Sequence, residues 1–122
     1  MAWLVEMDVA VQEWLDSLDE PTYKAVMAAV VVLQREGPSL GRPLVDTITR
    51  SRLANLKELR PPAPGRQTIR VLFAFDPLRA AFLLVGGDKT NNWDRWYERN
   101  IPLAEQRYEK HLLELRRKGE QT

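Results

Sequence analysis

The sequence predicts a single α+β domain in which an N-terminal pair of helices packs on a small, mostly antiparallel, twisted sheet. The expected order of elements is β-α-α-β-β-β-α. The 122 residues are a typical length for one domain. Apolar residues recur with helical spacing near both ends of the chain, and they alternate with a period of two in its middle.

The first 36 residues predict a short strand and two helices. The alternation across Trp3–Met7 indicates a half-buried strand. Asp8 can cap a first helix, and Gly37 with Pro38 ends a second helix at about Thr22–Arg35. A short turn joins the two helices, which predicts a hairpin with an acidic outer surface. The apolar stripe of the first helix consists of Val11, Trp14, Leu15 and Leu18.

The middle of the chain predicts three strands. Residues 38–51 are expected to be a loop, followed by a strand at about Leu53–Arg60 and a rigid turn at 61–66. A second strand covers "QTIRVLFAFDP", and the turn "FDPLR" leads into a third strand, "AAFLLVGG". One face of the second strand carries Ile69, Val71, Phe73 and Phe75, and the other carries Thr68, Arg70, Leu72 and Ala74.

The segment "GGDKTNNWDRWYERNIP", residues 86–102, is expected to be a strand-to-helix loop, with Pro102 opening the last helix. Its many aromatic and basic residues fit either a well-packed loop or a surface for nucleic acid. For at least one of Trp93 and Trp96 we favour packing against the last helix. The buried face of that helix is expected to hold Ile101, Ala104, Tyr108, Leu112 and Leu115.

Composition excludes several kinds of site. The chain has no Cys and one His, so disulfides, zinc-thiolate sites, thiol nucleophiles and histidine metal clusters are ruled out. Asp88 and Asp94 are too sparse for a two-metal site, and we expect no metal and no cofactor. No apolar run approaches the ~20 residues that span a membrane. We see no signal peptide, and we expect a cytoplasmic protein without membrane contact.

Charge is unevenly distributed along the chain. Residues 1–36 hold two basic and seven acidic residues, whereas residues 42–99 hold eleven basic and six acidic residues. This asymmetry suggests a basic working face and an acidic outer layer. The alternative is that the arginines are solvated at strand edges.

Strand alternation places Glu58 and Arg60 on one side of their strand, with Lys57 and Leu59 on the other. Neighbouring strands joined by a short loop normally pair, so Arg70 can meet Glu58 and Arg60 on one sheet face. The three residues are either part of a functional site or a structural ion pair between Glu58 and Arg70. Arginine in a central strand is unusual unless it is paired or functional.

Lys89 and Tyr97 are expected near the same end of the sheet, close to Arg70. A metal-free group of Arg, Lys and Tyr suits cleavage of RNA through its own 2′-OH, because the protein then supplies only a base, an acid and positive charge on the phosphate. A dense positive field can lower the pKa values of Lys and Tyr enough for these roles.

The stretches "LKELR", "RVLFAFDP" and "LLVGGDKTNNWDRWYERNIPLAEQRYEKHL" resemble the HigB-like, phage-derived branch of the RelE/ParE toxin superfamily of bacterial type II toxin–antitoxin systems. The resemblance covers about Trp3 to Leu113 and implies a RelE-like fold. It also implies a toxin that cleaves mRNA on the translating ribosome without a metal. The implied partner is a helix-turn-helix antitoxin from a neighbouring gene.

The resemblance implies that Arg60 and Arg70 stabilise the phosphate. Lys89 would be a base or second phosphate contact, and Tyr97 an acid/base or stacking group. Some relatives have His residues in the site, whereas His111 lies on the last helix, where we expect it to pack. The superfamily also contains gyrase inhibitors that do not cut RNA and inert prophage-derived relatives, which remain the alternative. We expect further RNA contacts from Lys57, Arg66, Trp93, Arg95 and Trp96.

Overall fold

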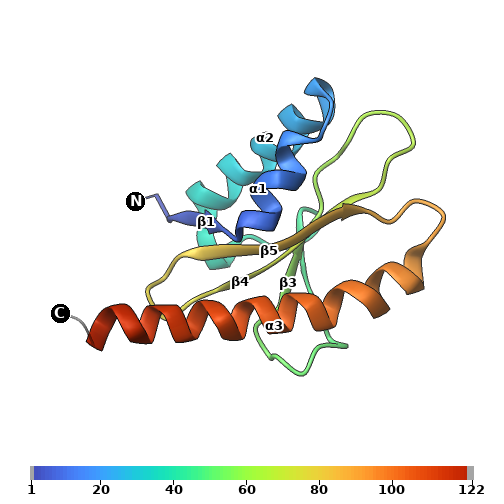
Figure 1. The fold of residues 1–122 in the computed structure, drawn as a ribbon. Helices are drawn as coiled ribbons and strands as arrows, with labels where there is room; N and C mark the ends of the chain where they lie inside the picture. The colour runs from blue at the N-terminus through green and yellow to red at the C-terminus, as the bar shows by residue number, and fades with distance from the viewer. Residues whose placement is uncertain (1, 121–122) are drawn as a thin grey trace.

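The computed structural model describes residues 2–120 and shows one sheet with helices on both of its faces (Figure 1). No helix in this part of the chain is both long enough and apolar enough to cross a membrane. The strands are β1 (Val5–Met7), β2 (Val45–Thr47), β3 (Lys57–Leu59), β4 (Ile69–Phe75) and β5 (Ala81–Asp88). The helices are α1 (Val9–Asp16), α2 (Glu20–Glu36), α3 (Trp93–Glu120) and a 3₁₀ turn, η1 (Gly37–Ser39).

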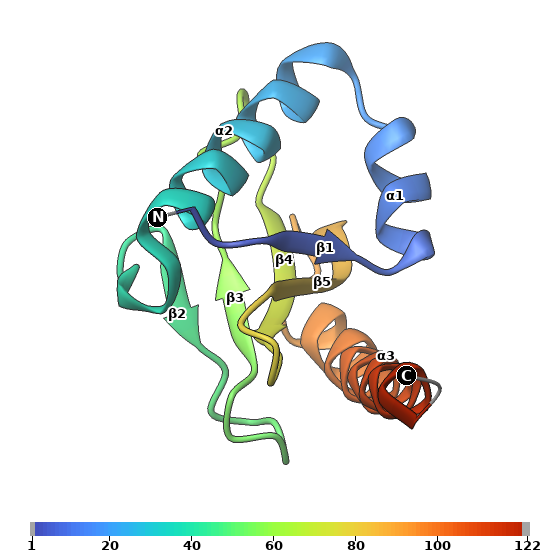
Figure 2. The same cartoon turned by 90° about the vertical axis from the view of Figure 1, so that its left-hand side faces the viewer.

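The five strands lie in the order β1-β5-β4-β3-β2 (Figure 2). β1 runs parallel to β5, and every other neighbouring pair is antiparallel. Asp76 shapes the β4–β5 hairpin, because its Oδ1 accepts the N–H groups of Leu78 at 2.9 Å and Ala80 at 3.0 Å. The α+β class, the hairpin and the mostly antiparallel sheet are confirmed.

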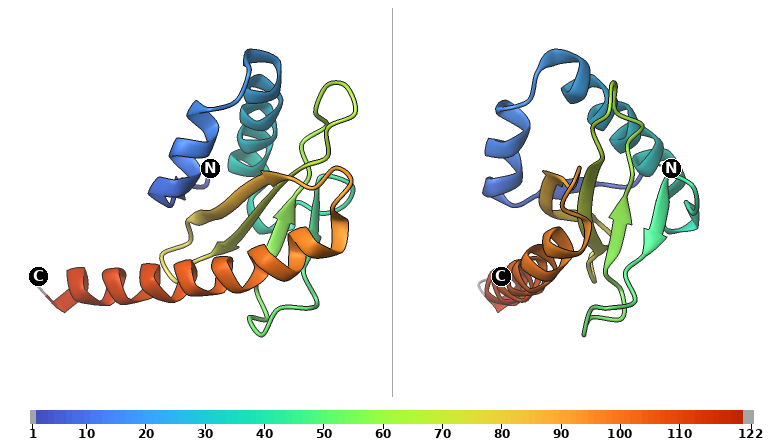
Figure 3. Two further views of the ribbon diagram at one scale, coloured as in Figure 1. Left: turned by 45° about the vertical axis from the view of Figure 1, so that its right-hand side comes forward. Right: turned by 90° about the vertical axis from the view of Figure 1, so that its right-hand side faces the viewer.

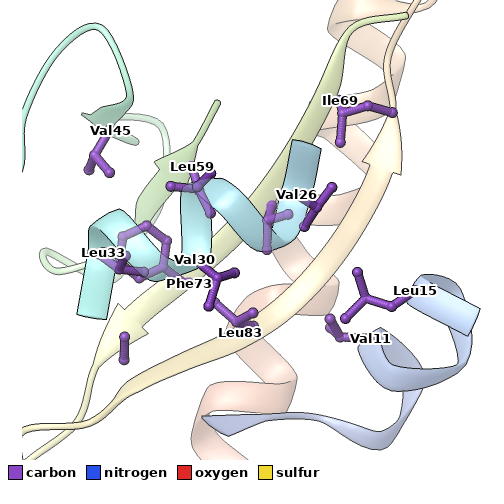
Figure 4. Close-up of a cluster of buried hydrophobic side chains, with 13 residues drawn as sticks. Val11, Leu15, Val26, Val30, Leu33, Val45, Leu59, Ile69, Phe73 and Leu83 are labelled. Carbon is purple, nitrogen blue, oxygen red and sulfur yellow. The ribbon is translucent and has the colours of Figure 1, made fainter. Parts of the chain in front are cut away.

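One face of the sheet is covered by α1 and α2, which lie on the same side of it (Figure 3). Each helix begins at an aspartate cap: Asp8 accepts the N–H of Ala10, and Asp19 accepts the N–H of Thr22. The residues between helices and strands form a buried apolar cluster (Figure 4), which includes Val11, Leu15, Val26, Val30, Leu33, Leu59, Ile69, Val71, Phe73 and Leu83.

The opposite face is covered by α3 (Figures 1 and 3). Its apolar side packs on the β4 positions that alternate with the first cluster, as the period of two requires. The predicted assignment of β4 residues to two faces is therefore confirmed. The second core cluster consists of Ile48, Leu56, Leu72, Ala74, Leu84, Val85, Trp96, Ile101, Ala104 and Tyr108.

Three sequence predictions about element bounds are corrected. The expected loop at 38–51 contains β2, a short edge strand that pairs with β3. The expected strand from Leu53 to Arg60 shrinks to β3, because "RLAN" has few residues that favour strands. Finally, α3 begins at Trp93 rather than at Pro102, which lies inside the helix.

Pro102 was expected to mark the start of a helix because its missing N–H is harmless in the first turn. Inside a helix, proline removes one backbone hydrogen bond. Ile101 before Pro102 and Ala104 after it are both buried, and this packing of the helix outweighs that cost. The change of start moves Trp93, Trp96 and Tyr97 from an irregular loop onto two helical turns.

Two adjacent glycines near the end of β5 let both helical layers approach the sheet closely. A Cβ on Gly86 would lie 2.2 Å from Cε3 of Trp14, which comes from α1. A Cβ on Gly87 would lie 2.6 Å from Nε1 of Trp96, which comes from α3. Neither position has room for a side chain, so the strand ends between two indole rings.

Candidate functional site

Glu58 is the centre of a group of polar side chains on the α3 side of the sheet. It is only 2% exposed. Its Oε1 accepts a hydrogen bond from the Tyr97 hydroxyl at 2.6 Å and lies 2.7 Å from Nε of Arg70. Nε of Arg60 is 3.5 Å from the same oxygen. We call Glu58, Arg60, Arg70, Lys89 and Tyr97 the Glu58 cluster.

Strand register explains why the two arginines meet Glu58. Glu58 pairs with Leu72 of β4, and Arg70 lies two residues away on the same face. Arg60 directly follows β3, and its guanidinium also reaches Oδ2 of Asp46 in β2 at 3.2 Å. The prediction that Glu58, Arg60 and Arg70 share one sheet face is confirmed.

Lys89 and Tyr97 complete the cluster from the other side. Lys89 follows β5, where its backbone N–H donates to the Thr68 carbonyl at 3.0 Å. Its Nζ donates to the Tyr97 hydroxyl at 2.8 Å and lies 3.9 Å from the ring centre of Trp93. The result is a continuous chain of contacts from Lys89 through Tyr97 and Glu58 to Arg70.

The environment shifts the two titratable groups of this chain in opposite ways. Burial, reinforced by the positive charge of Arg70, lowers the pKa of the Lys89 ammonium below its usual value. Burial, followed by the hydrogen bond to Glu58, raises the pKa of the Tyr97 hydroxyl well above its usual value. Tyr97 therefore keeps its proton, whereas Lys89 loses its proton more readily than an exposed lysine.

Both arginines retain unused donor capacity. Nη1 of Arg70 donates to the Ile69 carbonyl at 2.8 Å, but its Nε–H is not aligned with the nearby Glu58 oxygen. The Nε atoms of Arg60 and Arg70 are buried and form no hydrogen bond within residues 2–120. Both Nε atoms lie against the Glu58 carboxylate, so an anion would meet the exposed parts of these side chains, which are 27% exposed for Arg60 and 15% exposed for Arg70.

The residues expected to contact RNA are not all at this site. Trp93 is 56% exposed beside Lys89, and the exposed Arg66 is held close by through its carbonyl, which accepts from Thr90. Trp96 is a correction: at 7% exposure it packs in the core, so no ring face is free for a base. Lys57 lies on the opposite sheet face from Glu58, and helical spacing directs Arg95 away from the buried side of α3.

The structure adds Arg50, which the sequence prediction missed. Its Cζ lies 5.0 Å from the ring centre of Tyr97. Arg50 comes from an irregular segment after β2, where no periodic pattern points to a site. Next to Tyr97 there is an open surface hollow of about 350 Å³, lined by Arg50, Arg52, Tyr97, Glu98, Ile101, Pro102 and Glu105.

A second buried polar pair lies away from the Glu58 cluster, at the β4–β5 turn. Nε2 of His111 is 2.8 Å from Oδ2 of Asp76, and the His111 ring stacks on Phe82 with centres 3.6 Å apart. The prediction that His111 packs on the last helix is confirmed. In residues 2–120 no group of three or more His, Asp or Glu side chains is arranged to hold a metal ion.

Sequence comparison identifies a protein family and two relatives of this chain. The family described as phage derived protein Gp49-like matches residues 13–109. The chain is 45% identical to the putative toxin HigB2 of Mycobacterium tuberculosis over 93% of its own length, and it spans 56% of that relative. It is 50% identical to the putative toxin HigB3 of the same organism, over 84% of this chain and 87% of the relative.

The fold has a solved counterpart. An arginine-to-alanine double variant of the E. coli toxin RelE in the free state superposes with a TM-score of 0.57 at 11% identity, over 75% of this chain and 87% of the other. At that identity the likeness concerns the fold alone. The sequence relatives and the shared architecture agree with the resemblance drawn from "LKELR" and "GGDKTNNW". The chain belongs to the Gp49-like family of phage-derived proteins, is similar to the putative toxins HigB2 and HigB3, and has a RelE-like fold.

Proposed function

We propose that the chain is the toxin of a type II toxin–antitoxin system and that it cleaves mRNA on the ribosome without a metal ion. The observation that carries this proposal is the buried chain Lys89–Tyr97–Glu58–Arg70, with a second arginine beside it. It combines a lysine of lowered pKa, a protonated tyrosine and two cations within one site. The names of the relatives, putative toxins HigB2 and HigB3, support the toxin assignment.

The proposed reaction uses the RNA 2′-OH as nucleophile. Neutral Lys89 accepts the 2′-OH proton, the 2′-oxygen attacks the adjacent phosphorus, and the P–O5′ bond breaks. Tyr97 donates its proton to the departing 5′-oxygen, and the products are a 2′,3′-cyclic phosphate and a 5′-hydroxyl. The hydrogen bond from Lys89 to Tyr97 then returns the proton to the tyrosine, so the site is restored.

Arg60 and Arg70 stabilise the charge that develops on the phosphate. A phosphate would contact the exposed parts of the two guanidinium side chains, because their Nε atoms face the Glu58 carboxylate. Glu58 acts through its neighbours: it fixes one side of Arg70 and orients the Tyr97 hydroxyl. Without such a partner, two arginines and a lysine this close together would repel one another.

Two partners belong to the proposal. The ribosome presents the mRNA, and a helix-turn-helix antitoxin from a neighbouring gene neutralises the toxin. Contacts of Lys and Arg with phosphate release condensed counterions, so binding to ribosomes is expected to weaken as salt rises. An affinity that stays constant between low and moderate ionic strength would contradict a phosphate-led interface.

The test is expression of the chain alone and together with the adjacent antitoxin gene. We expect growth arrest in the first case and normal growth in the second. Primer extension on a reporter mRNA in a translating extract should show cuts inside the reading frame that vanish without ribosomes. Growth arrest without any cuts would instead support a gyrase-inhibiting toxin, and a harmless, soluble chain would support an inert relative.

A further inference from the structure

We propose that the hollow beside Tyr97 holds one nucleobase of the RNA, next to the cleaved phosphate, and that Glu98 selects which base it accepts. This inference rests on the proposed function, because it assigns a substrate subsite to the same reaction. The hollow has a volume of about 350 Å³, within the range of small-ligand sites.

Tyr97 connects the hollow to the Glu58 cluster. Its hydroxyl bonds with Glu58 and Lys89, while the residue also lines the hollow. A phosphate held by Arg60 and Arg70 therefore lies at one end of Tyr97, and the hollow opens beside it. A nucleotide has the same layout, with a flat base attached through a sugar to its phosphate.

The walls combine flat or apolar surfaces with charged groups of both signs. Ile101 and Pro102 provide an apolar lining, and the Arg50 guanidinium lies over the Tyr97 ring. Aromatic rings and guanidinium planes are the surfaces on which bases of single-stranded RNA stack. The surrounding positive charge of Arg50 and the Glu58 cluster favours a polyanion as occupant.

One wall is held rigidly. Glu105 of α3 is buried and accepts hydrogen bonds from Ser51 Oγ at 2.7 Å and from the Arg52 backbone N–H at 2.9 Å. Arg52 also forms ion pairs with Glu105 and Glu109. These contacts fix the segment that carries Arg50 against the helix, so the hollow exists before a ligand binds.

Glu98 is the acceptor that remains free at the rim. It is exposed, and within residues 2–120 its side chain forms no hydrogen bond or ion pair. A carboxylate accepts from the exocyclic amino group of cytosine and, by the same chemistry, from that of adenine or guanine. Uracil has no exocyclic amino group and offers only its ring N3–H as a donor. The hollow is therefore expected to prefer a base with an amino group over uracil.

Helix α3 also places an aromatic residue on the other side of Tyr97. Trp93, Tyr97 and Ile101 follow one another at intervals of four residues, about 6 Å apart along the helix. Trp93 is exposed, and Lys89 Nζ lies over its ring. An RNA strand that follows α3 would meet the Trp93 ring on one side of the cleaved phosphate and the hollow on the other.

The experiment maps cut sites on reporter mRNAs in a translating extract, with the base at each position next to the cut varied in turn. The parent should prefer an amino-bearing base over uracil at one such position. Glu98→Gln should change that preference at least fivefold or so, the lower end for one specific base contact. Glu114→Gln, an exposed glutamate further along α3, is the matched control and should keep the parent's pattern.

A second variant fills the hollow. Pro102 is exposed, so Pro102→Phe blocks the space without opening the core. Cleavage should fall at least about tenfold, whereas Gln106→Phe, on the outer face of α3, should cleave like the parent. Melting temperature and antitoxin binding verify that each variant is folded.

The outcomes separate the two proposals. If the parent cuts RNA and both Glu98→Gln and Pro102→Phe cut at the same bases and the same rates, the hollow is not a base subsite, and the proposed function stands. If the folded parent cuts no RNA, both proposals are overturned.

Discussion

The two faces of the sheet are built from the same strands but hold very different residues. Under α1 and α2 the buried side chains are almost all apolar, with Thr22 as a buried polar exception. Under α3, apolar residues share the interior with charged ones. The buried charged or titratable side chains that lie among or beside the α3 packing are Glu58, Asp76, Lys89, Glu105 and His111.

Because of this difference, core residues and residues of the candidate site alternate along a single strand. In β4, Val71 and Phe73 face the apolar cluster under α1 and α2. Arg70, which lies between Ile69 and Val71, faces the Glu58 cluster. The face under α1 and α2 is packed almost entirely with apolar residues, so the α3 face can carry charged residues beside its own core cluster at a cost in stability. Changes at neighbouring positions of one strand should therefore have different consequences.

The largest expected effect on stability is on the sheet face that α1 and α2 cover. Phe73→Ala removes a fully buried ring and should lower the free energy of unfolding by about 3–5 kcal/mol. Thermal unfolding followed by circular dichroism measures the loss. Val31→Ala, at an exposed position of α2, is the control and should change stability by less than about 0.5 kcal/mol. Equal effects of the two variants would mean that this face is not the main core.

The second prediction concerns Arg70. As a transition-state contact, its loss through Arg70→Ala should cost about 2.7–4 kcal/mol, or about 10²–10³ in cleavage rate. Stability should fall much less than with Phe73→Ala, because Glu58 keeps Tyr97 and Arg60 as partners. Growth arrest, primer extension and melting temperature are scored together.

Two further variants make the test of Arg70 more specific. Arg70→Lys keeps a cation beside Glu58 but loses the forked donor geometry, so it should restore stability and not full activity. Glu58→Ala, which keeps both arginines, reports what the carboxylate contributes to folding. An Arg70→Ala variant that remains fully toxic, or that unfolds together with Glu58→Ala, would make Arg70 a structural residue.

The third prediction concerns the pair that lies away from the site. His111→Phe keeps a ring for stacking on Phe82 but removes the partner of Asp76 Oδ2. An unsatisfied buried acceptor should cost about 1–3 kcal/mol of stability. Cleavage by the folded fraction should not change, as measured at a temperature well below the transition. A specific loss of cleavage at unchanged stability would assign His111 to the chemistry.

The smallest effect on stability is expected at Lys89, where substitution should increase stability instead of lowering it. Lys89 is 3% exposed and its pKa is lowered from 10.5, so folding favours its neutral form. Lys89→Met should raise the free energy of unfolding by about 1 kcal/mol at neutral pH, about 4 °C in melting temperature, while abolishing cleavage. A variant that is both less stable and still active would contradict the assignment.

The same residue predicts a pH dependence. Between its lowered pKa and 10.5, Lys89 binds fewer protons in the native state than in the unfolded chain, so stability rises with pH in that window. Lys89→Met should lose this rise. Cleavage by the parent should also increase with pH through the lowered pKa, and Lys89→Arg, which keeps its proton, should abolish that increase.

Sequence patterns were sufficient where one regular period dominates. The alternation in β4 predicted both faces correctly, and with them the meeting of Arg70 with Glu58 and Arg60. The patterns failed where the local preference of a helix-breaking residue opposed the burial of its neighbours. We predicted that Pro102 starts a helix. The buried residues Trp96 and Tyr108 show instead that one helix packs on the sheet both before and after Pro102.

That one error explains why Trp96 was counted among the RNA contacts. With α3 starting at Trp93, helical spacing would have directed Trp96 into the core and Tyr97 toward Glu58. Arg50 and β2 could not be predicted in this way, because they lie in a segment with no sustained period. Their positions follow from tertiary contacts, such as pairing with β3 and the Glu105 bonds to Ser51 and Arg52.

The paired glycines at the end of β5 have a consequence for how this sequence can vary. A conservative exchange at a charged residue of the site can preserve folding, but Gly86 and Gly87 have indole rings against opposite sides of their backbone. Even Ala at either position would push a helix away from the strand that leads to Lys89. Two residues with no functional groups are thus as restrictive for this fold as its catalytic candidates, and drift in Trp14 or Trp96 must be matched by the glycine that faces it.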